Sequence, residues 1–258
     1  MKPAASIIIF TVLSGFGFGL FFWLGLTART QNLNIQIITF TLAFLLSTIG
    51  LVASSFHLGN PQRALLAFTQ WRSSWLSREA ILAVLTLIFY LLHAVLILFF
   101  NLNLSWLGIV CAVFSLLTIF STAMIYTQMK TVPRWNMSII PPLFLLYGAT
   151  GSSVIVESFF LCSFLFFTLG ALQVLSWILG DRKFKAISHI GTATGLSNKR
   201  GIVRMLEPPH TGTNYLLKEM VFIVAQKHIF KLRLISLLLF SIVPLIISIL
   251  CIIFNQEY

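Results

Sequence analysis

The segment from His57 to Glu79 gathers side chains that could carry chemistry in an otherwise apolar chain. It contains one His, three Arg, one Glu and two Trp. His57 and Glu79 each adjoin an apolar stretch, where ionisable groups are costly and tend to be functional. A His takes up or releases a proton near neutral pH, a Glu at a helix start can act as a second base, and Arg63 donates hydrogen bonds without accepting a proton. Together they could hydrogen-bond a carbonyl or hydroxyl oxygen and move a proton.

The same segment also has a simpler interpretation, as an ordinary loop between two membrane spans. Arg72 and Arg78 would then set the orientation of the chain, and the two Trp would lie in the aromatic belt at the membrane surface. His57 and Glu79 are not needed for orientation, and this favours a functional role for them. Gly59 would let the backbone approach a ligand closely.

Few other residues offer chemistry. Tyr90 and His93 follow in the next apolar stretch and are weaker candidates, since such residues more often serve packing. Without any C-x-x-C motif, the sequence predicts no iron–sulfur or zinc site. We expect no haem either, because His57 and His93 lie at unlike depths, and we expect the Gly-Phe-Gly-Phe-Gly run from Gly15 to Gly19 to serve close helix packing. The cysteines lie far apart in apolar runs: Cys111, Cys162 and Cys251.

Composition defines the class of protein. Only 9% of the 258 residues are charged and 58% are hydrophobic, whereas a soluble domain has about 25% charged residues. The apolar runs are continuous over about 20 residues, which predicts membrane helices and not the alternating strands of a barrel. We therefore expect an all-α, polytopic transmembrane helix bundle forming one domain over residues 1–258. The first run is too long for a typical signal peptide and is expected to stay as a helix. Seven spans are predicted: Ala4–Leu26, Ile35–Phe56, Ile81–Phe100, Leu104–Tyr126, Ile139–Val156, Phe159–Leu179 and Leu234–Phe254.

The charges predict the orientation of these spans. Successive segments between the spans lie on alternate sides of the membrane. This arrangement places 16 of the 17 basic residues and four of the six acidic ones on one side, giving net charges of +12 there and −1 on the other side. Basic loops stay in the cytoplasm, so the N-terminus and the segments 57–79, 130–134 and 180–233 are expected there. A nucleic-acid partner is not expected, because the basic residues are spread over several loops next to lipid.

The segment 180–233 is the one long stretch expected outside the membrane. Its first half is predicted to be a cytoplasmic loop, since Pro208 and Pro209 would break a helix. From about Tyr215 to Arg233, apolar and basic residues alternate in a pattern typical of an interfacial amphipathic helix. An eighth span here would have to bury Glu219 or Lys227, and we regard it as the alternative.

Three stretches of the sequence are similar to a known family. The first is H-L-G-x-P-x-R-A from His57 to Ala64, followed by R-S-S-W-L-S-R-E up to Glu79. The others run from Lys130 to Pro142 and from Asn214 to Arg233. These motifs resemble the membrane anchor subunit of the dimethyl sulfoxide reductase family (DmsC type). The N-terminal run looks more like the anchors of membrane-bound sulfite-oxidising enzymes. The family is usually drawn with eight spans.

The resemblance implies a function for the whole chain. It implies a non-catalytic anchor in the bacterial inner membrane, binding an iron–sulfur electron-transfer subunit and a molybdopterin catalytic subunit on the cytoplasmic face. Such an anchor exchanges electrons with quinone or quinol (menaquinone or ubiquinone), and holds no haem, iron–sulfur cluster or molybdenum itself. The family's quinol-site residues correspond to His57, Gly59, Arg63 and Glu79.

Two other interpretations stay open. A small transporter would show inverted repeats and polar residues in broken helices, and no convincing internal repeat is visible. A purely structural tether would hold the partners without binding a quinone. Co-purification with a molybdenum and iron–sulfur pair would separate the anchor from the transporter.

Overall fold

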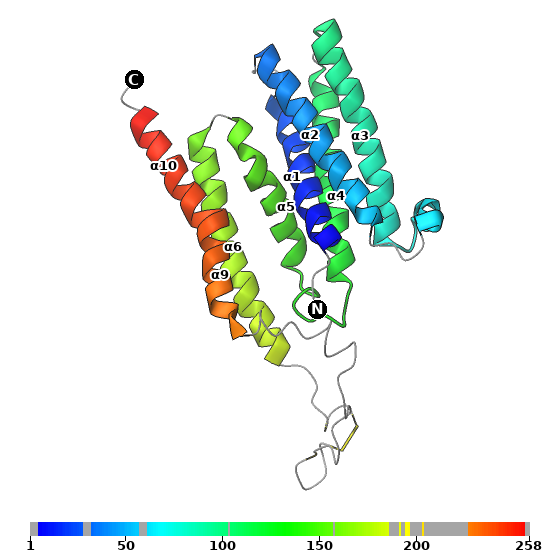
Figure 1. Ribbon diagram of the computed structural model, residues 1–258, viewed down its shortest axis with the longest axis vertical. Coiled ribbons are helices and arrows are strands. Elements are labelled where there is room, and N and C mark those ends of the chain that lie inside the picture. The colour runs from blue at the N-terminus through cyan, green and yellow to red at the C-terminus, as the bar shows by residue number, and fades with distance from the viewer. Residues whose placement is uncertain are drawn as a thin grey trace.

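The computed structural model describes residues 5–27, 32–56, 61–102, 104–156, 158–185, 191, 194–196, 203 and 227–255. Over these residues the chain is helical and contains no strand, as the sequence predicts. The main helices run up and down in succession (Figure 1). They are α1 (Ala5–Thr27), α2 (Leu33–Ser55), α3 (Trp75–Phe100), α4 (Ser105–Thr127), α5 (Ile140–Ser152), α6 (Phe159–Lys185), α9 (Ile229–Leu237) and α10 (Val243–Asn255).

Six of the described helical segments are long and apolar enough to cross a membrane. The segment from α5 into the 3-10 turn η3 (Ser153–Val156) is shorter, and α9 joins α10 through the π-helical turn η5 (Leu238–Ile242) to form one span. These segments match the seven predicted spans. The predicted interfacial helix lies outside the described residues up to position 226, and the last span already begins at Ile229.

Besides the start of the last span, two predicted boundaries differ from the structure. Helix α3 begins at Trp75 and not at Ile81, so Glu79 lies inside the helix; Ser77 and Glu79 are both buried, and burial against α4 extends the helix past the apolar run. Helix α6 continues from Leu179 to Lys185 and so carries Asp181, which forms ion pairs there. In both cases a polar side chain with a partner extends the helix beyond its hydrophobic part.

Helix α1 is the centre of the bundle. It packs against α2, α4 and α5, while α6 packs against α5 and α10 on the outside. The Gly-rich run of α1 makes this possible, as predicted: a Cβ added at Gly17 would lie 2.6 Å from the Ser47 backbone nitrogen of α2. One added at Gly19 would lie 2.7 Å from the Gly148 carbonyl carbon of α5. Close backbone approach between small residues is the usual way that membrane helices associate.

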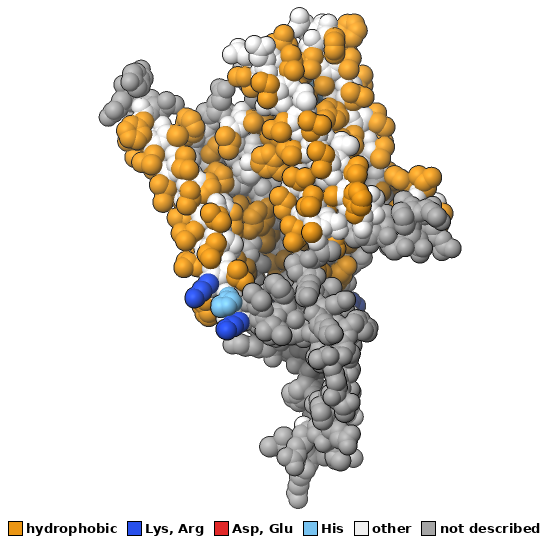
Figure 2. Space-filling view, viewed as in Figure 1, with side chains coloured by type: hydrophobic (Ala, Val, Ile, Leu, Met, Phe, Trp, Pro, Cys, Tyr) orange, Lys and Arg blue, Asp and Glu red, His pale blue; other side chains and the backbone are white. Residues whose placement is uncertain are grey.

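The outer surface of the bundle is apolar along its helices. Figure 2 shows hydrophobic side chains over the helix faces, and Lys, Arg and His side chains where α9 begins. The basic residues whose side chains the structure describes gather at the end of the bundle where α4 and α6 end and α3, α5 and α9 begin, which we term the basic end. This agrees with the predicted grouping of the charged segments. The basic end carries Arg72, Arg78, Lys130, Arg134, Arg182, Lys183, Lys227, Lys231 and Arg233.

Candidate functional site

Glu79 lies one turn into α3 at the basic end, and its side chain is only 4% exposed. Of the acidic side chains that the structure describes, it alone is buried. The Thr122 hydroxyl of α4 donates a short hydrogen bond to the Glu79 carboxylate. An ionisable group buried in a membrane bundle is costly unless it is paired, and it usually marks a functional position. Glu79 is thus a buried carboxylate with a neutral hydroxyl as its hydrogen-bond partner.

Sequence analysis did not identify Thr122. It belongs to a stripe of hydroxyl residues on α4, Ser115, Thr118 and Thr122, whose spacing places them on one helix face. All three are buried. The spacing was readable from the sequence, but the stripe is equally typical of ordinary packing between membrane helices.

The polar residues of α3 line up on one face toward α4. Thr86 and Thr118 lie with their hydroxyl oxygens 3.0 Å apart, and Tyr90 and His93 follow one and two turns further along α3. His93 is 14 positions beyond Glu79, or about 21 Å along the helix axis at 1.5 Å per residue. The structure therefore separates Tyr90 and His93 from Glu79. One ligand head group cannot contact both Glu79 and His93.

Tyr90 and His93 are enclosed by aromatic side chains. The Tyr90 ring stacks on Phe21 of α1 with ring centroids 4.1 Å apart, and the His93 ring meets Phe40 of α2 edge-on at 6.1 Å. The Tyr90 hydroxyl lies beside the backbone of Gly25. Within the described part of the chain, neither this hydroxyl nor the ring nitrogens of His93 form a hydrogen bond of normal geometry. Their placement is that of core residues in the other half of the bundle.

The structure describes one of the remaining predicted site residues in part. His57 and Gly59 lie outside the described residues, and for Arg63 only the backbone is described, in the 3-10 helix η2 (Pro61–Phe68). Helix η2 packs against α3. Arg63 thus belongs to an element that contacts the helix carrying Glu79.

Arg78 has a structural role in this segment. Its Nε donates to the Trp71 carbonyl at 2.9 Å and its Nη2 to the Arg72 carbonyl at 2.8 Å. Its guanidinium also lies 4.3 Å from the centre of the Trp75 ring, within the range of a cation–π contact. Arg78 therefore holds the turn between η2 and α3 in place.

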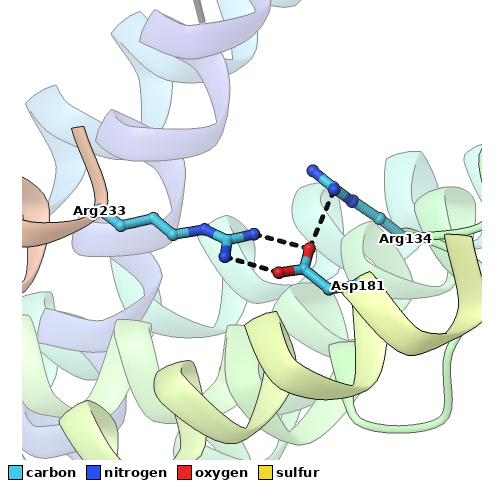
Figure 3. A network of polar contacts seen from close by, with 3 residues as sticks. All are labelled: Arg134, Asp181 and Arg233. Carbon is cyan, nitrogen blue, oxygen red and sulfur yellow. Dashed lines mark hydrogen bonds and ion pairs between the residues drawn. The ribbon is translucent and has the colours of Figure 1, made fainter. Parts of the chain in front are cut away.

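A second polar cluster ties the basic end together. Asp181 of α6 accepts two hydrogen bonds from Arg233 of α9, at 2.7 and 2.8 Å, and pairs with Arg134 at 2.9 Å (Figure 3). Arg134 comes from the segment between α4 and α5. Lys183 also donates to the Asn136 side chain of this segment at 3.0 Å. This cluster fixes the outer pair α6 and α9 against the α4–α5 segment, and it leaves the basic end with a large excess of positive charge.

Metal ligands do not gather in the part of the chain that the structure describes. No three His, Cys, Asp or Glu side chains there lie close enough together to hold a metal ion. Cys111 and Cys162 are buried singly, and Cys251 is half-buried. At Glu79, the described residues can support hydrogen bonding and proton transfer.

Comparison with known proteins identifies the family. The model of the DMSO reductase anchor subunit (DmsC) family matches residues 1–256, and the chain belongs to this family of membrane anchors of oxidoreductase complexes. A stretch of 180 residues is 32% identical to the C subunit of the sulfite dehydrogenase of Allochromatium vinosum, covering 62% of this chain. The match covers 55% of that protein, so the chain spans about half the length of the curated relative. No solved structure matches the chain. The predicted resemblance is thereby confirmed.

Proposed function

We propose that this anchor exchanges electrons between the membrane quinone pool and an iron–sulfur subunit bound at its basic end, while a molybdopterin subunit performs the substrate chemistry. Quinol oxidation releases two protons and two electrons, so the site needs a group that can take up a proton inside the membrane. Glu79 is such a group, buried and hydrogen-bonded at the end where a partner would bind. This single observation carries the proposal.

The quinone site that we propose consists of His57, Gly59, Arg63 and Glu79. Glu79 and His57 accept protons, Arg63 holds a ring oxygen or fixes Glu79, and Gly59 gives the ring close access to the backbone. The packing of η2 against α3 supports this grouping, because η2 carries Arg63 and contacts the helix that carries Glu79. Tyr90 and His93 are left out of the site by their distance from Glu79.

The basic end is the surface that we propose for partner binding. Its positive charges would attract and orient an acidic partner surface, and the positive-inside rule would place this end in the cytoplasm of a bacterial cell. The named relative belongs to a sulfite dehydrogenase, so a sulfur-compound oxidoreductase is the partner class we favour. Electrons then need only a short path from a quinone near Glu79 to a cluster docked on the same end.

The test uses the whole complex, purified through a tag on this chain from membranes of the native host. Turnover is measured with quinone and with an artificial dye that reacts with the partner subunits directly. We expect His57→Ala to abolish quinone-linked turnover and Glu79→Gln to slow it by about 100-fold, the usual scale for loss of a proton-transfer group. Dye-linked turnover should not change.

A matched control and the contrary outcomes complete this test. His228 lies at the same end, at the start of α9, and His228→Ala should leave quinone-linked turnover unchanged. If His57→Ala and Glu79→Gln release the partners from the membrane, the residues are structural and the chain is a tether. If both variants keep full quinone-linked turnover, the proposed site is wrong.

A further inference from the structure

A cavity of about 330 Å³ lies between α1, α4 and α5 in the half of the bundle toward the basic end. Its walls are mostly apolar, with Phe16 of α1, Ile119 of α4 and Phe144 of α5 among them. Val12, another lining residue, is 60% exposed on the outer surface, so the cavity reaches the side of the bundle where lipid would lie. A volume of this size suits a small ligand that enters from the membrane.

Thr122 connects this cavity to Glu79. Its side chain lines the cavity, and its hydroxyl donates the hydrogen bond to the Glu79 carboxylate of α3. Glu79 itself does not line the cavity. A hydroxyl has one hydrogen to donate and two lone pairs that accept. Thr122 can therefore accept a hydrogen bond from a ligand while its own hydrogen is directed at the carboxylate.

We propose that this cavity holds the quinol ring and that Thr122 relays a proton from it to Glu79. The inference rests on the proposed proton transfer to Glu79 and changes where the ring lies. With the ring in a cavity that Glu79 does not line, Arg63 acts by fixing Glu79, the access of the ring to the Gly59 backbone is no longer required, and Thr122 is the residue that contacts the ring hydroxyl. The ligand class follows from the walls: a flat, membrane-soluble ring fits the apolar side chains, and its hydroxyl can donate to Thr122. A lipid acyl chain would fill the same volume but has no hydroxyl to donate.

The proton and electron balance of this step is complete. The two electrons of the quinol pass to the iron–sulfur partner. The hydroxyl of the ring at Thr122 gives its proton to the Thr122 oxygen, and Thr122 passes its own hydrogen to the Glu79 carboxylate. The proton of the second ring hydroxyl passes to water at the basic end. Glu79, one turn into α3, then releases its proton toward the basic end.

The first variant fills the cavity. Gly15 lines it, and a Cβ added there would meet no atom within 4 Å, so Gly15→Leu places its side chain in open space without moving the backbone. Replacing a Gly within a helix should not lower helix stability. We expect Gly15→Leu to raise the KM for quinone by about tenfold or more with dye-linked turnover unchanged. Val113→Leu, at a 48% exposed position of α4 that does not line the cavity, is the control.

The second variant removes the relay. Thr122→Val keeps the shape of the side chain but not its hydroxyl, and we expect it to lower quinone-linked kcat by about 100-fold with little change in KM. Thr122→Ser keeps the hydroxyl and should restore turnover, a rescue that a packing role for the methyl group would not give. A raised KM in Gly15→Leu would report on binding of the ring in the cavity. A lowered kcat in Thr122→Val would report on proton transfer.

The outcomes separate this inference from the proposed function. If Gly15→Leu and Thr122→Val both keep normal quinone-linked turnover while His57→Ala abolishes it, the cavity is not the ring site and the inference is overturned, although the anchor still reacts with quinone. If Gly15→Leu displaces a co-purifying lipid without changing the KM for quinone, the cavity is a lipid site and the inference is equally overturned.

Discussion

Thr86 of α3 and Thr118 of α4 meet inside the bundle, with their hydroxyl oxygens 3.0 Å apart and both side chains almost fully buried. Each hydroxyl is also close to a carbonyl of its own helix, Leu82 for Thr86 and Phe114 for Thr118. The pair is the midpoint of the polar stripe that begins at Glu79. It fixes the rotation of α3 against α4, and this rotation brings Glu79 to Thr122.

Loss of this contact should have a modest effect on stability. Hydrogen bonds between membrane helices contribute about 0.6 kcal/mol on average and up to about 1.7 kcal/mol. We expect Thr118→Val to destabilise the bundle within this range, because the Thr86 hydroxyl keeps its own carbonyl acceptor. Reversible unfolding in detergent would measure the change. Thr118→Ser, which keeps the hydroxyl, is the control, and equal stability of the Val variant and the native protein would contradict the prediction.

The centre of the bundle depends on the absence of a side chain at Gly19. An added Cβ would lie 2.6 Å from the Ser152 hydroxyl oxygen as well as against Gly148, and both belong to α5. We expect Gly19→Ala to destabilise the protein by about 1–3 kcal/mol, the usual cost of overpacking. The matched control is Gly15→Ala in the same helix, where the Cβ has open space. Similar thermal stability of the two variants would show that α1 does not pack on α5 this closely.

Hydropathy alone predicts all seven helical segments, because the bilayer sets the length of each apolar run. It does not predict which helices are neighbours. Glu79 stands out in the sequence as a charge beside an apolar run, but its partner Thr122 lies 43 positions away on a helix whose rotation only tertiary packing determines. The run from Gly15 to Gly19 likewise predicts close packing, without indicating that Gly17 would meet α2 and Gly19 would meet α5.

The Asp181 cluster should contribute little to overall stability and more to the shape of the basic end. The Asp181 side chain is 35% exposed and the Arg134 side chain 42% exposed, so water and salt screen their attraction. We expect Asp181→Asn to cost about 1 kcal/mol or less, with a smaller effect at high salt. Cysteines placed on α9 and on the α4–α5 segment should cross-link less selectively in this variant. Arg233→Lys keeps the charge but loses the bidentate contact with Asp181. Its stability and cross-linking selectivity should lie between those of the native protein and Asp181→Asn.

The orientation of the bundle can be tested at two exposed leucines. Leu65 of η2 is 79% exposed at the basic end, and Leu102 follows α3 at the opposite end with 52% exposure. In a variant without native cysteines, we expect Leu102→Cys in intact cells to react with a membrane-impermeant thiol reagent and Leu65→Cys to react only after the membrane is opened. The reason is the charge distribution: turning the basic end outward would carry its Lys and Arg residues across the membrane, against the positive-inside rule. Labelling of Leu65→Cys from outside would show that the basic end faces outward. The partner subunits would then have to bind on the outer side of the membrane.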